Sequence, residues 1–301
     1  MSNWWAANRK NFARWAGTFL ATALIVFLIR EEGGDDLLSA LKRVSVWFFL
    51  VGILIMLISR LFVVGRWHVL LRSGKVDISL KHTAMLTFTG LFSSNFLPTT
   101  IGGDVVRLGG AMQLGYDRAV CLASLVADRL IGMIGMSFTV PFGLVPLLAL
   151  GNDGLQALTI STIFQKGIEF IQRTFAAFAI WLKKPVPLLT SFLATFGNMA
   201  CIFAAVYFLI IGMGLHMSYW LIAGLWSLTY FITLIPISVN GYGVQELSLT
   251  FLLSRIGGLS HSESLTVAIL IRALFVVTSF PGALFLPAIL AAMSDERDKT
   301  I

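Results

Sequence analysis

Long, unbroken apolar runs constrain this chain more than any other feature of its sequence. Those at residues 12–29, 45–64, 188–211 and 264–292 are close to, or beyond, the roughly 20 residues that an α-helix needs to cross a bilayer. Charged residues make up only 12% of the 301 residues, whereas soluble domains carry about 25%. The runs are continuous, while a transmembrane β-barrel needs alternating apolar and polar residues. The sequence therefore predicts an all-α polytopic membrane protein, with residues 1–301 forming one integral membrane domain.

The charges between the runs predict the orientation. The most basic stretch follows the second run and comprises Arg60, Arg66, Arg72, Lys75 and Lys81. Lys and Arg collect in cytoplasmic loops, so this stretch is expected in the cytoplasm and the acidic residues 31–36 outside. Both termini are then cytoplasmic, and an inner (cell) membrane location is expected. The run at 12–29 is interpreted as an uncleaved anchor, because it is long and lacks a small-residue cleavage site.

The same topology explains the net charge of +7, so no nucleic-acid partner is expected. The two cysteines lie in apolar runs, and neither a Cys-x-x-Cys motif nor a Cys/His cluster occurs. The sequence therefore suggests no metal site, no cofactor and no disulfide framework.

One short pattern occurs twice, at residues 95–107 and at 234–246. In each copy an apolar run reaches a proline, Pro98 or Pro236, then a glycine-bearing break, and then a second apolar run that carries charges in its first turns. Proline lacks a backbone donor and restricts the residue before it, so it ends a helix. The pattern predicts two helices that are broken inside the membrane.

The first broken helix is too short to cross. About 15 apolar residues, 83–97, reach roughly two-thirds of the way across the hydrocarbon core, and 104–113 lead back. We expect a re-entrant hairpin from the cytoplasmic side, and a second one, 218–235 with 244–254, from the opposite side. Residues 218–235 are also long enough to span the membrane.

With the membrane crossings that follow them, at about 119–147 and 264–292, these hairpins define a first repeat at 83–147 and a second, inverted repeat at 218–292. Residues 155–187 are expected as a cytoplasmic or interfacial connector, although 155–182 could instead cross the membrane. The expected fold has about six full transmembrane helices and two inverted re-entrant hairpins. Inverted repeats of this kind place a substrate site near the bilayer midplane in many transporters.

The residues at the two breaks are of types that bind anions. Helix N-termini carry free N–H groups and a positive dipole end that bind phosphate or carboxylate, and arginine forks onto phosphate oxygens. An ionised residue at mid-membrane costs roughly 2.5–3.5 kcal/mol on insertion scales, so it is usually paired or functional. The candidate substrate-binding residues are Pro98, Gly102, Gly103, Asp104, Arg107, Asp128, Arg129, Pro236, Asn240, Gly241, Gly243, Glu246 and Arg272.

Structural roles are the alternative for these residues. Asp104 and Arg107 are spaced to pair along one helix face. Arg129 and Arg272 could instead pair across the repeats with Glu246 or Asp128, and the glycines could serve turn geometry alone. Glu246 is also a candidate proton-coupling carboxylate.

The residues that carry these patterns resemble a known family. They are Pro98 to Arg107, Asp128-Arg129-Leu130, Pro236 to Glu246, and Arg66-Trp67 with Leu70-Leu71. They look like the lysylphosphatidylglycerol synthase transmembrane family, a flippase-like membrane domain. The resemblance implies movement of a phospholipid between leaflets. Synthase activity is not implied, because in fused members a separate soluble domain makes the aminoacyl lipid.

The resulting hypothesis is a lipid flippase that moves an anionic phospholipid or polyprenyl-phosphate lipid, with the headgroup between the broken helices and the buried arginines. It is not expected to be an enzyme, and no catalytic residue is assigned. No ATP-binding Gly-x-x-x-x-Gly-Lys motif occurs, so an ion gradient or the lipid gradient would drive transport. One alternative is a scaffold that partners a lipid-biosynthesis enzyme, and another is a lipid-phosphate transferase using Asp104 and Asp128.

Overall fold

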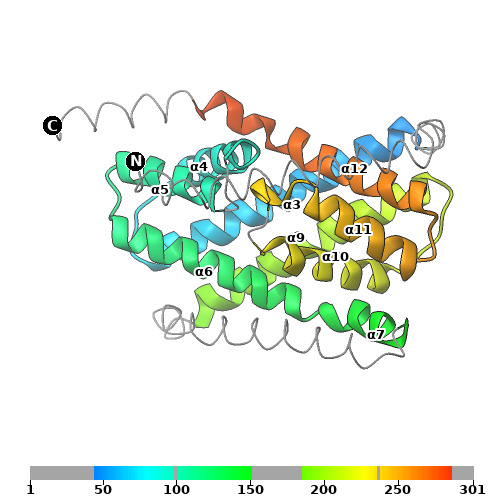
Figure 1. Cartoon of the computed structure of the whole chain (residues 1–301). Coiled ribbons are helices and arrows are strands. Elements are labelled where there is room, and N and C mark those ends of the chain that lie inside the picture. The colour runs from blue at the N-terminus through cyan, green and yellow to red at the C-terminus, as the bar shows by residue number, and fades with distance from the viewer. Residues whose placement is uncertain (1–43, 98–100, 151–184, 236–237, 287–301) are drawn as a thin grey trace, which may run out of the picture.

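The computed structural model describes residues 44–97, 101–150, 185–235 and 238–286, and all regular structure in these residues is helical (Figure 1). The α-helices are α3 (Val46–Ser73), α4 (Leu80–Ser94), α5 (Gly102–Gln113), α6 (Arg118–Ser137), α7 (Val140–Leu150), α9 (Pro185–Gly212), α10 (Tyr219–Thr233), α11 (Val244–Arg255) and α12 (His261–Ser279). Two 3₁₀ turns are η1 (Val239–Gly241) and η2 (Phe280–Leu284).

Four helices in this part of the chain are long and apolar enough to cross a membrane: α3, α6, α9, and α12 continued through η2. They correspond to four of the expected crossings. The expected crossing at 12–29 and the uncertain segment 155–182 lie outside the described residues. Helices α7 and α10 are apolar but shorter.

The basic stretch after the second run was partly misplaced by the sequence prediction. Helix α3 does not end near residue 64 but continues to Ser73. Arg66 therefore lies inside the helix, as does Arg60, which is already within the expected run, and the two are buried at 8% and 5% exposure. Arg66 pairs with Asp128, whereas Arg60 contacts Thr278 and the Phe275 ring.

Two expected helices are interrupted. The crossing predicted over 119–147 is divided at Phe138 and Thr139, where α6 ends and α7 begins one residue before Pro141. The Thr139 hydroxyl is buried there, within 2.6 Å of the Ser227 hydroxyl. The last crossing changes to 3₁₀ geometry at Phe280, beside Pro281. Both changes follow from proline, which lacks the N–H that continues a helix.

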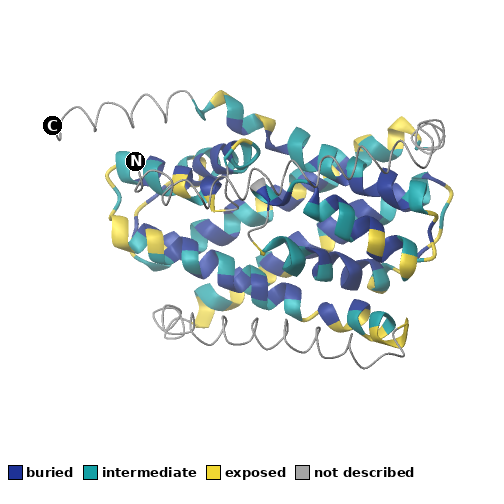
Figure 2. Cartoon of the chain, in the orientation of Figure 1, coloured by how far each residue is buried: buried dark blue, intermediate teal, exposed yellow. Residues whose placement is uncertain are grey.

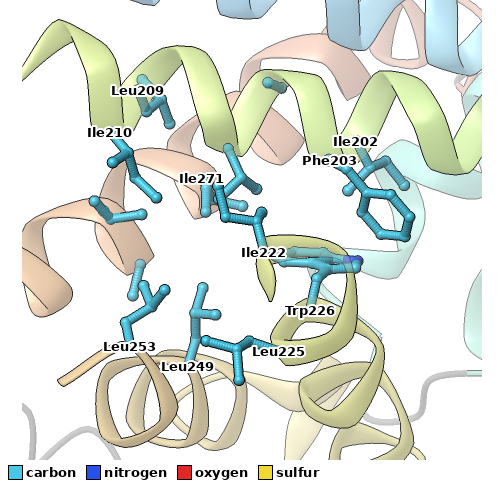
Figure 3. Close-up of a cluster of buried hydrophobic side chains, with 14 of the residues drawn as sticks. Ile202, Phe203, Leu209, Ile210, Ile222, Leu225, Trp226, Leu249, Leu253 and Ile271 are labelled. Atoms are coloured by element: carbon cyan, nitrogen blue, oxygen red, sulfur yellow. The ribbon is translucent and has the colours of Figure 1, made fainter. Parts of the chain in front are cut away.

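The largest hydrophobic core joins α9, α10, α11 and α12 (Figure 3). Trp226 of α10 stacks on Phe275 of α12, with ring centroids 5.8 Å apart and ring planes within 5°. By contrast, one stripe of α3 carries exposed apolar side chains, among them Leu50, Leu54 and Leu61, and exposed positions are distributed over the outer helices (Figure 2). Such a stripe suits a lipid-facing surface.

The two broken helices form two pairs of short helices. Helix α4 packs on α5, and α10 packs on α11; in Figure 1 the first pair lies toward one end of the molecule and the second toward the other. Their breaks meet: the Tyr242 hydroxyl donates to Asn95 Oδ1 at 3.4 Å. Asn95 also donates through Nδ2 to Ser279 Oγ at 2.9 Å, which ties the meeting point to the end of α12.

Candidate functional site

A buried ion-pair cluster surrounds Asp128, in the middle of α6. Its Oδ1 accepts a hydrogen bond from Arg66 Nε at 2.6 Å, and its Oδ2 lies 3.4 Å from Arg107 Nη1. Asp128 is 3% exposed. Arg66 also donates to Thr195 Oγ1 on α9 at 3.1 Å, so Asp128 holds together α3, α5 and α6, and Arg66 links them to α9.

Asp104, in the first turn of α5, extends this cluster. It accepts hydrogen bonds from Arg107 Nη1 at 3.1 Å and from Arg129 Nε. The Arg107 guanidinium lies 4.0 Å from the centroid of the Trp67 ring, a cation–π contact. Among the described residues, three arginines thus face two aspartates, so these five side chains together carry one net positive charge.

A second ion pair lies at the other break. Arg272 Nε of α12 donates to Glu246 Oε1 of α11. The other oxygen, Oε2, accepts the backbone N–H of Gly243 at 2.7 Å. Arg272 also lies 4.5 Å from the Tyr242 ring centroid. The start of α11 therefore already carries a carboxylate, and the N–H of Gly243 is not free for a ligand.

The two breaks are built alike. Asp104 and Glu246 are each the third residue of the helix that follows the break. Each accepts a hydrogen bond from an arginine of the next long helix, Arg129 at a separation of 25 residues and Arg272 at 26. The alternative of pairing across the repeats was wrong, because both arginines pair within their own half. The expected pairing of Asp104 with Arg107 is confirmed at 3.1 Å.

The glycines of the first break serve close packing. A methyl group on Gly103 would lie 2.1 Å from Ser94 Oγ and 2.4 Å from the Gly90 carbonyl oxygen, and one on Gly102 would lie 2.5 Å from Leu97 Cβ. Both glycines are buried. Helix α5 can pack this closely against α4 only because these side chains are absent.

The second break needs unusual backbone angles instead. Gly241 and Gly243 have φ of 73° and 79°, and Asn240 has φ of 47°. Glycine adopts this left-handed region freely, and asparagine is among the few other residues that visit it. Pro98 and Pro236, the two prolines of the pattern, lie outside the described residues.

A cavity of about 260 Å³ lies where the two breaks meet. Its lining includes three arginines, Arg60, Arg129 and Arg272. Polar side chains from both breaks also line it, among them Ser94, Asn95 and Asn240, and part of the wall is apolar. Three of the predicted site residues therefore line the cavity, namely Arg129, Asn240 and Arg272. Asp104, Arg107, Asp128, Glu246 and the glycines are not among its lining residues.

A second cavity of about 210 Å³ adjoins the first, lined by Arg66, Thr195 and Asn198 among others. The residues common to both linings are Tyr230, Thr233, Gln245 and Phe275. The two cavities thus share one wall, between the ion pairs of the first break and those of the second.

Sequence reasoning missed Arg60 and Arg66 as site residues. The available signal was their position inside or directly after an apolar run, which is the same signal that singled out Arg129 and Arg272. Because further basic residues follow both arginines, the sequence pattern placed them in a cytoplasmic loop.

The family model of the lysylphosphatidylglycerol synthase transmembrane region matches residues 14–282. The chain belongs to this family. It is therefore a multi-pass membrane protein, as its four described spans indicate.

A curated relative is a "UPF0104 membrane protein" of Methanothermobacter thermautotrophicus. It is 30% identical over 134 residues, which cover 44% of this chain and 36% of the relative. The match thus spans about a third of the relative's length.

Proposed function

We propose that the protein is a lipid flippase that moves an anionic phospholipid or polyprenyl-phosphate lipid between leaflets. The headgroup would bind in the 260 Å³ cavity while the hydrocarbon chains stay in the surrounding lipid. The observation that carries this proposal is that Arg60, Arg129 and Arg272 line one cavity at the meeting point of two helix breaks. Cations in a low-dielectric interior attract an anion far more strongly than they do in water.

The proposal includes the membrane placement of the short helices. Helices α4 and α5 have 15 and 12 residues, so at 1.5 Å per residue they extend about 22 and 18 Å, less than the roughly 30 Å core. We infer re-entrant hairpins that enter from opposite sides, in two inverted repeats, with both termini in the cytoplasm. Contact between Asn95 and Tyr242 supports a meeting point at mid-membrane.

Exposure of Arg129 supports access for a headgroup. Its side chain is 36% exposed although it pairs with Asp104, whereas the side chain of Asp128 is only 4% exposed. Helices α6 and α12, which carry Arg129 and Arg272, would bring the two cations to the headgroup from two sides. An ion gradient or the lipid gradient would supply the drive.

The transferase alternative receives less support. It needs Asp104 and Asp128 to hold a metal ion or to act as nucleophiles. Both carboxylates are instead engaged by arginines, Asp128 through both of its oxygens. We therefore propose a transporter rather than an enzyme.

The test is a leaflet assay with the purified full-length chain in liposomes. Fluorescent anionic and zwitterionic lipids with identical acyl chains are placed in both leaflets, and the outer label is quenched chemically. We expect the wild type to expose the inner pool of anionic lipid, and Arg129→Gln and Arg272→Gln to slow this at least tenfold. The matched control is Arg255→Gln, which removes an exposed arginine from the end of α11.

A negative result in this assay would distinguish the proposals. If the folded wild type moves none of the lipids, the flippase proposal is refuted. The scaffold alternative then predicts that Arg129→Gln still binds a lipid-biosynthesis enzyme as the wild type does.

A further inference from the structure

Arg60 is the least compensated charge in the described part of the chain's interior. It is 5% exposed, and none of the ion pairs between described residues includes it. Its contacts are with α12: a long hydrogen bond from Nη2 to Thr278 Oγ1 at 3.4 Å and the face of the Phe275 ring at 4.7 Å. Its Nε is buried without a hydrogen-bond partner.

A buried guanidinium without a carboxylate needs a reason. Arginine stays protonated in proteins, and a lone charge at mid-membrane is unfavourable by roughly 2.5–3.5 kcal/mol on insertion scales. The neighbouring ring recovers part of this. Arg60 lines the cavity together with Arg129 and Arg272, so an anion in the cavity would supply the missing partner.

The net charge of the side chains around the cavity indicates how many negative charges the anion should carry. Arg66, Arg107 and Arg129 face Asp104 and Asp128, leaving one positive charge. Arg272 and Glu246 cancel. Arg60 adds one more, so the described side chains of this assembly together carry a net charge of +2.

We propose that this cavity selects a phosphomonoester dianion over a phosphodiester monoanion, with Arg60 as the contact that makes the difference. The inference rests on the proposed function and specifies its substrate class: a lipid whose headgroup ends in a terminal phosphate.

A terminal phosphate fits the site in three ways. It carries a charge of about −1.5 to −2 at pH 7 and three acceptor oxygens, which match three guanidinium groups that bind phosphate in forked geometry. A diester offers one charge and two free oxygens. The cavity of about 260 Å³ is smaller than the roughly 300–1,000 Å³ typical of sites for drug-sized ligands, which suits a bare phosphate better than a bulky headgroup.

The experiment measures binding and translocation separately on the full-length chain. Phosphatidic acid is the phosphomonoester probe and phosphatidylglycerol, with the same acyl chains, is the phosphodiester probe. At pH 8 we expect the wild type to bind phosphatidic acid at least tenfold more tightly. At pH 5, below the second phosphate pKa of about 6, the preference should fall below threefold.

The protein groups that face the phosphate do not account for such a pH change. The cations of the lining are arginines, a residue type that does not lose its proton in proteins, and Tyr230 is the other titratable group among the described lining residues. Among the described lining residues there is no histidine. The carboxylates of Asp104 and Glu246 are held in ion pairs with Arg129 and Arg272.

Variants assign the preference to Arg60. We expect Arg60→Gln to reduce the preference at pH 8 below threefold and Arg60→Lys to keep most of it, while Arg255→Gln binds as the wild type does. Because Arg60 has no carboxylate partner among the described residues, Arg60→Gln should fold, and its thermal midpoint verifies this. If Arg60→Gln weakens both lipids equally, or Arg60→Lys loses the preference, Arg60 is structural and the inference is wrong.

The two readouts separate this inference from the proposed function. Equal binding of both lipids by a wild type that moves them refutes the dianion preference and leaves the flippase standing. Arg60-dependent preference without movement of any lipid refutes the flippase and leaves the binding inference standing. Competition with glycerol 3-phosphate shows whether the site binds soluble phosphomonoesters or only lipids. Displacement of the lipid indicates a site for soluble phosphomonoesters. No displacement indicates a site that also requires the lipid chains.

Discussion

Replacing Asp128 by asparagine tests the ion-pair cluster that joins the first break to α3 and α9. Asparagine has nearly the same shape, so the change removes a charge without leaving a cavity. Arg66 at 2.6 Å loses its carboxylate partner, whereas Arg107 keeps Asp104 at 3.1 Å. Breaking a buried pair by removing one partner costs about 3–5 kcal/mol. Since one of the two arginines stays paired, we expect about 3 kcal/mol.

Thermal unfolding in detergent measures this loss. The chain contains eight tryptophans, so fluorescence reports the transition. A change of 1 kcal/mol shifts the midpoint by about 2–4 °C in domains of 150–250 residues, so Asp128→Asn should lower it by about 6–12 °C. The matched control is Asp77→Asn, whose side chain is 94% exposed beside Arg72; it should cost less than about 1 kcal/mol.

A double variant then identifies the cause. Arg66→Met removes the stranded guanidinium, and replacing a whole buried pair by apolar residues is often neutral or stabilising. The variant Asp128→Asn/Arg66→Met should therefore be more stable than Asp128→Asn alone. If the two losses simply add within about 0.5 kcal/mol, or if Asp128→Asn melts with the wild type, this reasoning about the cluster is refuted.

Two further predictions concern the backbone at the breaks. Gly103→Ala should destabilise the protein by about 1–3 kcal/mol, as overpacking does, because the new methyl group would meet Ser94 Oγ at 2.1 Å; Gly65→Ala, with nothing within 4 Å, should be neutral or stabilising in the same melting assay. Asn240→Gly should melt within a few degrees of the wild type, whereas Asn240→Val should lose about 1–2 kcal/mol, since its φ of 47° is left-handed. Equal melting of the two variants in either comparison would contradict the geometry described for that break.

The approximate positions of the four described spans and of both breaks could be predicted from the sequence, although the end of α3 and the division between α6 and α7 could not. Span length and hydropathy depend on local composition, and proline and glycine disrupt a helix through their own backbone chemistry. The helix expected at 104–113 begins at Gly102 and ends at Gln113, and that expected at 244–254 ends at Arg255. Both predictions succeeded because the decisive residues lie within the element itself.

The partners of the charges could not be predicted in the same way. Arg66 meets Asp128 across 62 residues of sequence, and no local pattern indicates that distance. Positive charge after an apolar run has two explanations, a cytoplasmic loop or a buried pair, and only the tertiary structure distinguishes them. The contribution of Arg60 to the cavity was missed for this reason.

The roles of the predicted site residues also depended on packing. Sequence reasoning treated all of them as candidate ligands, because glycine and charged residues at a break suit an anion. In the structure Gly103 is required for contact between α4 and α5, and Asp128 orders Arg66 and Arg107. Arg129 and Arg272 do reach the cavity, so the ligand role remains a proposal for them.

Covalent filling of the cavity tests the central claim most directly. In a background with Cys121→Ala and Cys201→Ser, Thr233→Cys places a thiol in the wall shared by both cavities, and Leu54→Cys places one on the 60% exposed outer face of α3. Each variant is modified in detergent with a bulky sulfonated thiol reagent, verified by mass spectrometry, and assayed in liposomes before and after modification. We expect modification of Cys at position 233 to abolish lipid movement, and modification of Cys at position 54 to leave lipid movement unchanged. Undiminished lipid movement with residue 233 fully modified would contradict passage of the headgroup through this cavity.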